Sequence, residues 1–219
     1  MAEQQEPVKV KICGVTKPAH IDALNTHGVE LVGFNFFKPS PRYVSQDSAA
    51  QLAAQCRPDM ERVALLVDPS DDEVDMALAA VSPHRLQLHG HETPQRLAEI
   101  KARSHCALIK ALAIETPDDL AKTRDYQLAD WFLFDAKPPQ DATLPGGNGA
   151  AFDWTVLNAY DQSRPYLLAG GLDAANVVDA LRVTNAPMVD IASGVEVAPG
   201  EKDARMVADF VAAVRAIEA

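Results

Sequence analysis

The chain has 219 residues, 47% of them hydrophobic and 23% charged, with a formal net charge of −11. This composition is typical of a soluble globular protein, and the acid excess argues against nucleic acid or an anionic membrane as a partner, because both need a basic face. The start MAEQQEP is polar, and no apolar run approaches the roughly 18 residues that span a bilayer. We therefore expect a cytoplasmic protein with a polar tail over residues 1–7.

Three cysteines are present, Cys13, Cys56 and Cys106. Their odd number and their lack of a metal-ligand spacing argue against a disulfide framework and against a zinc site. Any functional cysteine is therefore expected to be a reduced thiol, and we expect no bound metal.

Short apolar or β-branched runs alternate with amphipathic segments along the whole chain. The predicted strands begin near Val8, Leu31, Arg62, Arg85, Cys106, Trp131, Pro165 and Pro187. Helix-start signals between them are the capping box Ser70 with Glu73, the pairs Thr93-Pro94 and Thr116-Pro117, and the aspartates Asp173 and Asp203. The clearest helix is the last, with apolar residues three and four apart from Met206 to Ile217.

Eight such units favour a closed, parallel (βα)8 barrel over a doubly wound open sheet. No linker divides the chain, so we expect one catalytic domain over residues 8–219. A dinucleotide-binding fold is disfavoured, because GGNG at 146–149 does not open a helix after a strand.

The first predicted strand carries polar residues on one face. Alternation places Lys9, Lys11 and Cys13 opposite Val10 and Ile12. In a barrel the apolar face packs on the helices and the other face lines the interior. Lys9, near the start of the strand, is expected at the bottom rim.

Other predicted strands carry similar polar insertions, at Gln87, His89, Lys110, Asp135 and Asp190. Parallel strands are normally almost unbroken hydrophobic runs. A buried charge needs a partner or a solvated mouth, so these groups indicate either a structural ion-pair network or an active site. Their place near the C-terminal strand ends favours the active site.

Three further features suggest chemistry. Lys11 and the helix expected after Pro18 should lower the pKa of the Cys13 thiol, which would suit a general base. Arg42 lies in a loop stiffened by prolines, as suits a carboxylate-binding guanidinium. Gly170-Gly171 and Ser193-Gly194 end the last two strands, where backbone amides can hold a phosphate.

Seven segments in this order resemble the motifs of the phosphoribosylanthranilate isomerase family of tryptophan biosynthesis: KICGVT, GFNFFKPSPRYVS, LQLHGHE, LFDAKPP, PGGNGAAFDW, LLAGGLDAANV and DIASGVEVAPGEKD. The resemblance implies a cofactor-free Amadori rearrangement of N-(5-phosphoribosyl)anthranilate, a phosphorylated small molecule, to 1-(2-carboxyphenylamino)-1-deoxyribulose 5-phosphate. Asn148 and the pair Ala150-Ala151 depart from the usual family pattern, which puts the contacts of their loop in doubt.

Matching motif to motif, the resemblance implies that Asp135 is the general acid, Cys13 the general base and Arg42 the group that holds the anthranilate carboxylate. The implied phosphate-binding residues are Gly171, Ser193 and Gly194, with Gly170 as support. We expect the remaining inward polar residues to contact substrate, namely Lys11, Gln87, His89 and Asp190. We expect a monomer or a weak homodimer.

Two other functions remain open from the residues. One is a sugar-phosphate aldolase that uses Lys110 as a Schiff-base amine. The other is a phosphate-sensing barrel without turnover.

Overall fold

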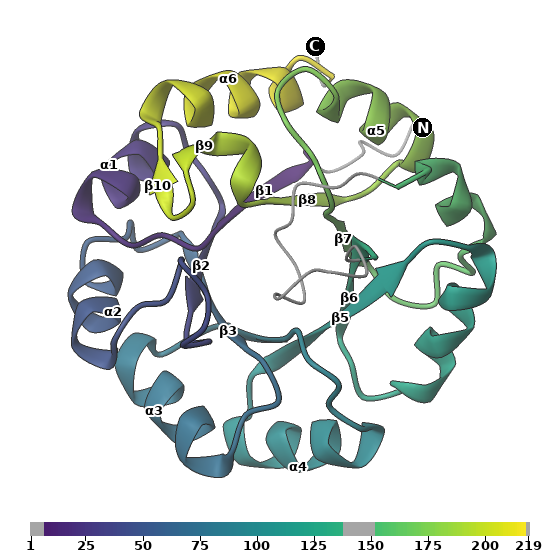
Figure 1. Cartoon of the computed structure of the whole chain (residues 1–219), viewed down its shortest axis with the longest axis horizontal. Coiled ribbons are helices and arrows are strands. Elements are labelled where there is room, and N and C mark those ends of the chain that lie inside the picture. The colour runs from purple at the N-terminus through teal and green to yellow at the C-terminus, as the bar shows by residue number, and fades with distance from the viewer. Residues whose placement is uncertain (1–6, 138–151, 218–219) are drawn as a thin grey trace, which may run out of the picture.

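The barrel predicted from the alternating pattern forms. The structure is a computed structural model that describes residues 7–137 and 152–217. Eight parallel strands close in the order β1 to β8 (Figure 1). They are β1 (Lys9–Cys13), β2 (Leu31–Asn35), β3 (Glu61–Leu66), β4 (Arg85–Leu88), β5 (Ala107–Ile114), β6 (Trp131–Ala136), β7 (Tyr166–Leu168) and β8 (Met188–Ile191). Each strand begins within one residue of its predicted start.

Helices form a ring outside the strands (Figure 1). The α-helices are α1 (Pro18–Thr26), α2 (Gln46–Ala53), α3 (Asp71–Val81), α4 (Pro94–Ser104), α5 (Val177–Thr184) and α6 (Ala204–Arg215), and the 3-10 helices are η1 (Pro117–Asp125), η2 (Trp154–Ala159) and η3 (Ser193–Val195). A small antiparallel hairpin of β9 (Glu196–Ala198) and β10 (Glu201–Lys202) follows β8. In Figure 1 this hairpin lies beside α1 and β1.

Three of the predicted helix starts are confirmed by their caps. Ser70 and Glu73 form the reciprocal capping box of α3, Thr93 accepts a hydrogen bond from the backbone N–H of the third residue of α4, and Asp203 caps α6 through two backbone amides. These bonds satisfy amides that have no partner within a helix.

Three predicted details differ from the structure. The segment after Thr116 starts as predicted, with Thr116 as the N-cap and Pro117 as the first residue, but it is a 3-10 helix, in which Leu120 is the one buried apolar side chain. Asp173 does not cap α5; its Oδ1 accepts from the backbone amides of Ala175 and Asn176 and so closes a turn before the helix begins. Helix α6 ends at Arg215, so Ile217 lies beyond it.

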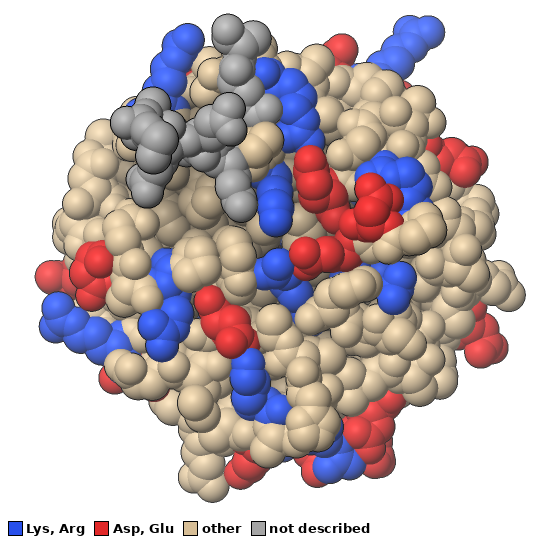
Figure 2. Space-filling view, turned by 180° about the vertical axis from the view of Figure 1, so that it is seen from behind, with Lys and Arg blue, Asp and Glu red and all other residues tan. Residues whose placement is uncertain are grey.

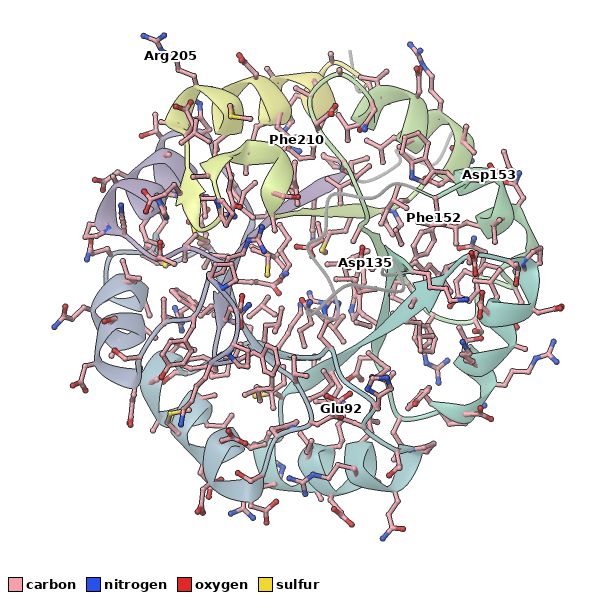
Figure 3. All side chains as sticks on the ribbon, viewed as in Figure 1. Glu92, Asp135, Phe152, Asp153, Arg205 and Phe210 are labelled. Carbon is pink, nitrogen blue, oxygen red and sulfur yellow. The ribbon has the colours of Figure 1, made fainter. Side chains whose placement is uncertain are left out.

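The core has two layers, as strand alternation requires. Val10 and Ile12 of β1 are fully buried in the large cluster between strands and helices, to which α6 contributes Phe210. Figure 3 labels Phe210, and also Arg205, whose exposed side chain extends outwards from the same helix. A second, smaller cluster comes from the alternate strand positions and fills the barrel interior: Leu31, Val63, Ile109, Ala111, Leu133, Leu167, Ala169 and Met188.

Charges on the surface are mixed. On the face in Figure 2, basic and acidic side chains lie beside one another. Within residues 7–137 and 152–217, none of the helices is both long and apolar enough to cross a membrane.

Lys110 of β5 is buried on the helix-facing side of its strand, because its neighbours Ile109 and Ala111 fill the barrel interior. It pairs with a residue that the sequence did not single out. Its Nζ lies 2.6 Å from Oε2 of Glu92, and the two side chains are 2% and 0% exposed. The ammonium also donates to the carbonyl of Gly90, and the Glu92 carboxylate accepts from the backbone amides of Asp68 and Gly90. One buried ion pair therefore joins the loops that follow β3 and β4.

Loss of either partner should destabilise the protein strongly. We expect Glu92→Gln or Lys110→Met to lower the free energy of unfolding by about 3–5 kcal/mol, because each leaves a buried charge without its partner. The double variant removes both charges, so its loss should be smaller than the sum of the two single losses. Urea unfolding measures these differences.

Glu115→Gln is the matched control, because Glu115 pairs with Lys137 where both side chains are more than half exposed. Its unfolding free energy should equal that of the wild type. Strictly additive losses in the double variant would contradict the ion-pair account.

Candidate active site

Cys13 ends β1 with its side chain inside the barrel, and it is 5% exposed. Its register partner on β2 is Gly33, where a Cβ would lie 2.7 Å from Sγ, so the thiol fits because that glycine has no side chain. Lys11, on the same face of β1, is fully buried and places Nζ 2.7 Å from Oδ1 of Asp190. Lys11 and Asp190 are also register partners of β1 and β8. The structure therefore brings the predicted base beside a buried ion pair.

The expected lowering of the thiol pKa is wrong. Burial raises the pKa of Cys13, because removal from water disfavours the thiolate, and the positive field of Lys11 opposes this only in part. Asp190 adds a negative field that favours the neutral thiol. Burial likewise disfavours the charge of Lys11, but Asp190 and Cys13 outweigh it and raise the Lys11 pKa.

Asp135 lies near the end of β6, inside the ring of strands (Figure 3). Its Oδ1 accepts from the backbone N–H of Ala136 at 2.8 Å, and its Oδ2 lies 3.5 Å from Nε2 of His89. Nδ1 of His89 is in turn 2.9 Å from Nε2 of Gln87. The three polar residues predicted on β4 and β6 thus form one chain of contacts.

Two of these residues, His89 and Asp135, face a cavity of about 140 Å³. The cavity is lined by His89, Gly90, His91, Ala111, Leu112, Ala113 and Asp135. The carboxyl of Asp135 is therefore placed where a small molecule could reach it.

Arg42 is brought to the same end of the barrel by the loop after β2. The hydroxyl of Ser40 accepts from both the backbone N–H of Arg42 and Nδ2 of Asn35, which fixes the loop. The stem of Arg42 crosses Gly14, whose φ is +79°; a Cβ there would lie 2.6 Å from Cδ of the arginine. Because Gly14 follows Cys13, the guanidinium stem lies beside the end of β1. Nε and Nη2 donate to the carboxylate of Glu196 at 2.9 and 2.8 Å.

The two glycine-containing strand ends meet. Gly170 and Gly171 have φ of +85° and +63°, a conformation that glycine adopts without strain. A Cβ on Gly194 would lie only 2.0 Å from the carbonyl oxygen of Leu172, so the backbone after β8 packs directly on the backbone after β7. A Cβ on Gly170 would lie 3.2 Å from Oδ1 of Asp135, which places this end next to the predicted acid.

Ser193 opens the short helix η3 at the same place. Every predicted site residue is described, and all except Lys11, which lies midway along β1, are at or near the C-terminal strand ends.

Three charged residues at this end were not predicted as site residues: Glu92, Glu196 and Lys202. None stands in a predicted strand, where a charge would interrupt an apolar run; Glu196 and Lys202 lie in the hairpin after β8 and look like ordinary loop residues in the sequence. The segment GGNG at 146–149, with Asn148, Ala150 and Ala151, lies outside the described residues. Among the described residues, no group of three His, Cys, Asp or Glu side chains could hold a metal ion.

Comparison with known proteins decides the family. The family model described as N-(5'-phosphoribosyl)anthranilate (PRA) isomerase matches residues 10–213. The chain belongs to the PRA isomerase family.

Curated relatives in this family are similar along nearly their whole length. The N-(5'-phosphoribosyl)anthranilate isomerase of Paracoccus denitrificans is 50% identical over 206 residues, which cover 94% of this chain and 96% of the relative. That of Rhodopseudomonas palustris is 47% identical over 208 residues, covering 94% and 98%.

Solved structures of PRA isomerases have the same fold. The enzyme from Thermotoga maritima has a TM-score of 0.84 at 29% identity, with 95% of this chain and 99% of that chain covered. A crystal structure of a PRA isomerase in complex with reduced 1-(o-carboxyphenylamino)-1-deoxyribulose 5-phosphate has a TM-score of 0.82 at 28% identity, with the same coverage.

The reactivity of Cys13 should reflect its environment. In a Cys56→Ser/Cys106→Ser background, we expect the rate of alkylation by iodoacetamide to rise with a midpoint above the usual thiol pKa of about 8.5, because burial disfavours the thiolate. Lys11→Met should move the midpoint higher, because it removes the cation that favours the thiolate.

Lys17→Met is the control, because Lys17 is half exposed and pairs with Glu201 on the surface. It should leave the midpoint unchanged. A midpoint below the usual value, or no shift in Lys11→Met, would contradict this electrostatic account.

Proposed function

We propose that this chain catalyses the Amadori rearrangement of N-(5-phosphoribosyl)anthranilate to 1-(2-carboxyphenylamino)-1-deoxyribulose 5-phosphate, with Cys13 as general base and Asp135 as general acid. One observation carries the proposal. In this chain, a member of the PRA isomerase family, Cys13 from β1 and Asp135 from β6 both lie inside the same end of the barrel. The crystal structure of a relative with a reduced 1-(o-carboxyphenylamino)-1-deoxyribulose 5-phosphate supports a phosphorylated small-molecule ligand.

The first step opens the sugar ring. Asp135 gives its proton to the furanose oxygen, the bond from that oxygen to C1 breaks, and the anthranilate nitrogen lone pair forms a C1=N iminium. Asp135 therefore has to carry a proton when the substrate binds.

The second step moves a proton from carbon. The iminium acidifies the proton on C2, the Cys13 thiolate removes it, and the electron pair forms the C1=C2 bond of an enolamine. Tautomerisation then gives the ketone at C2. A neutral thiol cannot accept this proton, so Cys13 must ionise in the complex, and the charge of Lys11 favours that ionisation.

The two anionic ends of the substrate have separate sites. Arg42 binds the anthranilate carboxylate, and the backbone amides of Gly171, Ser193 and Gly194 bind the phosphate, with Gly170 shaping the turn. Four inward polar residues line the space for the sugar between these sites: Lys11 and Asp190 beside Cys13, and Gln87 and His89 beside Asp135.

We propose further that residues 8–219 form one catalytic domain, which acts in the cytoplasm as a monomer or a weak homodimer. The phosphoribosylanthranilate isomerase of Thermotoga maritima is dimeric. Gel filtration with light scattering would establish the state of this chain.

An aldolase reaction through Lys110 is disfavoured by the contacts of that amine. Its Nζ lies 2.6 Å from the buried carboxylate of Glu92 and donates to the carbonyl of Gly90. A Schiff-base amine has to be free to attack a carbonyl, and these two contacts occupy the amine in a buried position. Borohydride should therefore trap no adduct at Lys110.

Replacing the acid or the base should abolish most turnover. We expect Asp135→Asn and Cys13→Ser each to lower kcat by about 10²–10⁴-fold, the usual contribution of a positioned acid or base. The loss of substrate fluorescence during phosphoribosylanthranilate consumption measures the rate.

The matched control is Cys106→Ser, because this half-buried thiol precedes β5 at the N-terminal end of the barrel, where it donates to the carbonyl of Pro83. It should retain wild-type turnover. Near wild-type turnover in Asp135→Asn would remove Asp135 from the acid role, and an inactive wild type would contradict the proposed reaction.

A further inference from the structure

One edge of the Arg42 guanidinium is hydrogen-bonded to Glu196. Nε and Nη2 donate to the two oxygens of Glu196, and the side chains of Arg42 and Glu196 are 8% and 3% exposed. A planar guanidinium carries five N–H donors, so this side-on contact leaves the edge formed by Nη1 and Nη2 for a second carboxylate. Among the residues that the structure describes, Nη1 donates no hydrogen bond.

Glu196 is in turn held by a second buried cation. Nζ of Lys202 lies 2.7 Å from Oε1 of Glu196 and donates to the carbonyl of Ala192 at 3.0 Å. The Lys202 side chain is 1% exposed. Ala192 directly precedes Ser193, so these contacts run from the loop of Arg42 to the proposed phosphate site.

The charges of Arg42, Glu196 and Lys202 suit the binding of an anionic ligand. Burial alone would disfavour the Glu196 carboxylate, but hydrogen bonds from Arg42 and Lys202 keep its pKa below the usual value. Burial lowers the pKa of Lys202, and the contact with Glu196 opposes that shift. With Lys202 protonated, the three groups carry one net positive charge, which an anionic ligand requires in a protein whose formal net charge is −11.

The hairpin that carries Glu196 and Lys202 is itself fixed to the barrel. The hydroxyl of Thr16 donates to the carbonyl of Gly200 at 2.9 Å, which ties the hairpin to the loop after β1. A Cβ on Gly200 would lie 2.7 Å from the carbonyl oxygen of Pro41, so the hairpin also packs directly on the loop of Arg42. Glu196 is therefore a rigid support and not a mobile surface carboxylate.

We propose that Glu196 and Lys202 are positioning residues for the carboxylate end of the substrate. Glu196 holds the guanidinium of Arg42 so that its second edge meets the ligand, and Lys202 holds Glu196 and keeps the group cationic. This inference rests on the proposed function, in which Arg42 binds the anthranilate carboxylate.

A different role for Glu196 would have the opposite effect. If Glu196 only cancelled the charge of Arg42, its removal would leave a stronger cation and tighten the binding of an anion. If Glu196 orients Arg42, its removal lets the guanidinium turn and weakens binding of the carboxylate alone.

The experiment uses two ligands that differ in one group. One is reduced 1-(o-carboxyphenylamino)-1-deoxyribulose 5-phosphate, and the other is the same compound without the carboxyl. Titration calorimetry on the full chain should show that Glu196→Gln weakens the carboxylated ligand by about tenfold, the scale of one charge-assisted contact, and leaves the other within about twofold. Lys202→Met should act in the same direction. KM for phosphoribosylanthranilate should rise by a similar factor with kcat nearly unchanged.

A double-variant cycle tests whether Glu196 acts through Arg42. In an Arg42→Ala background, Glu196→Gln should have no further effect on the carboxylated ligand. The matched control is Glu201→Gln, in the same hairpin, where the side chain is 45% exposed and pairs with Lys17. It should bind both ligands as the wild type does.

Four results would overturn the inference: no effect of Glu196→Gln, tighter binding in Glu196→Gln, equal weakening of both ligands, or an undiminished effect in the Arg42→Ala background. If Glu196→Gln fails to fold, Glu196→Asp, which keeps the charge but shortens the reach, should show the same selective loss. A wild type that is active while Glu196→Gln is unaffected refutes this inference alone, whereas a wild type without turnover refutes the proposed function.

Discussion

When eight parallel strands close into a barrel, every second side chain of each strand faces one shared interior. A charge buried there is stable only with a partner. Away from the C-terminal strand ends, the interior is filled with apolar residues such as Leu31 and Leu133. Towards the C-terminal strand ends, charges replace them and are paired, as Lys11 is with Asp190. On the helix-facing side of β5, Lys110 is paired with Glu92 in the same way. Removing one partner from such a pair costs several kcal/mol, so these pairs constrain the strand ends and loops around them.

That constraint positions the chemistry. The pair of Lys11 and Asp190 lies next to Cys13, on the side towards the N-terminal end of β1. The pair of Lys110 and Glu92 fixes the loop after β4. His89, which contacts Asp135, lies at the start of that loop. In the loop after β2 and the hairpin after β8, a third buried group joins Arg42, Glu196 and Lys202. Each proposed reacting or binding side chain is thus held by a neighbouring buried ion pair or by backbone, as a site organised before ligand binding requires.

Much of this could be predicted from the sequence because barrel strands carry a local signal. The alternation around Lys11 and Cys13 predicts which side chains face inwards, and polar residues at strand ends mark the site. The partners Glu92, Glu196 and Lys202 could not be predicted in this way, because they lie outside the barrel strands and their contacts depend on which connecting segments the closed barrel brings together. The sequence predicts the wrong direction for the pKa of the Cys13 thiol for a related reason: it shows the nearby cation Lys11, but it does not show how deeply the thiol is buried.

The central claim is that Cys13 and Asp135 reach one sugar whose phosphate and carboxylate are held at fixed sites. A crystal structure of this protein with reduced 1-(o-carboxyphenylamino)-1-deoxyribulose 5-phosphate tests it most directly. The account predicts Sγ of Cys13 about 3–3.5 Å from C2 of the ligand, the Asp135 carboxyl within hydrogen-bonding distance of the former ring oxygen, and the phosphate on the amides of Gly171 and Gly194. A ligand whose phosphate lies elsewhere, or whose C2 is beyond the reach of Cys13, would contradict it.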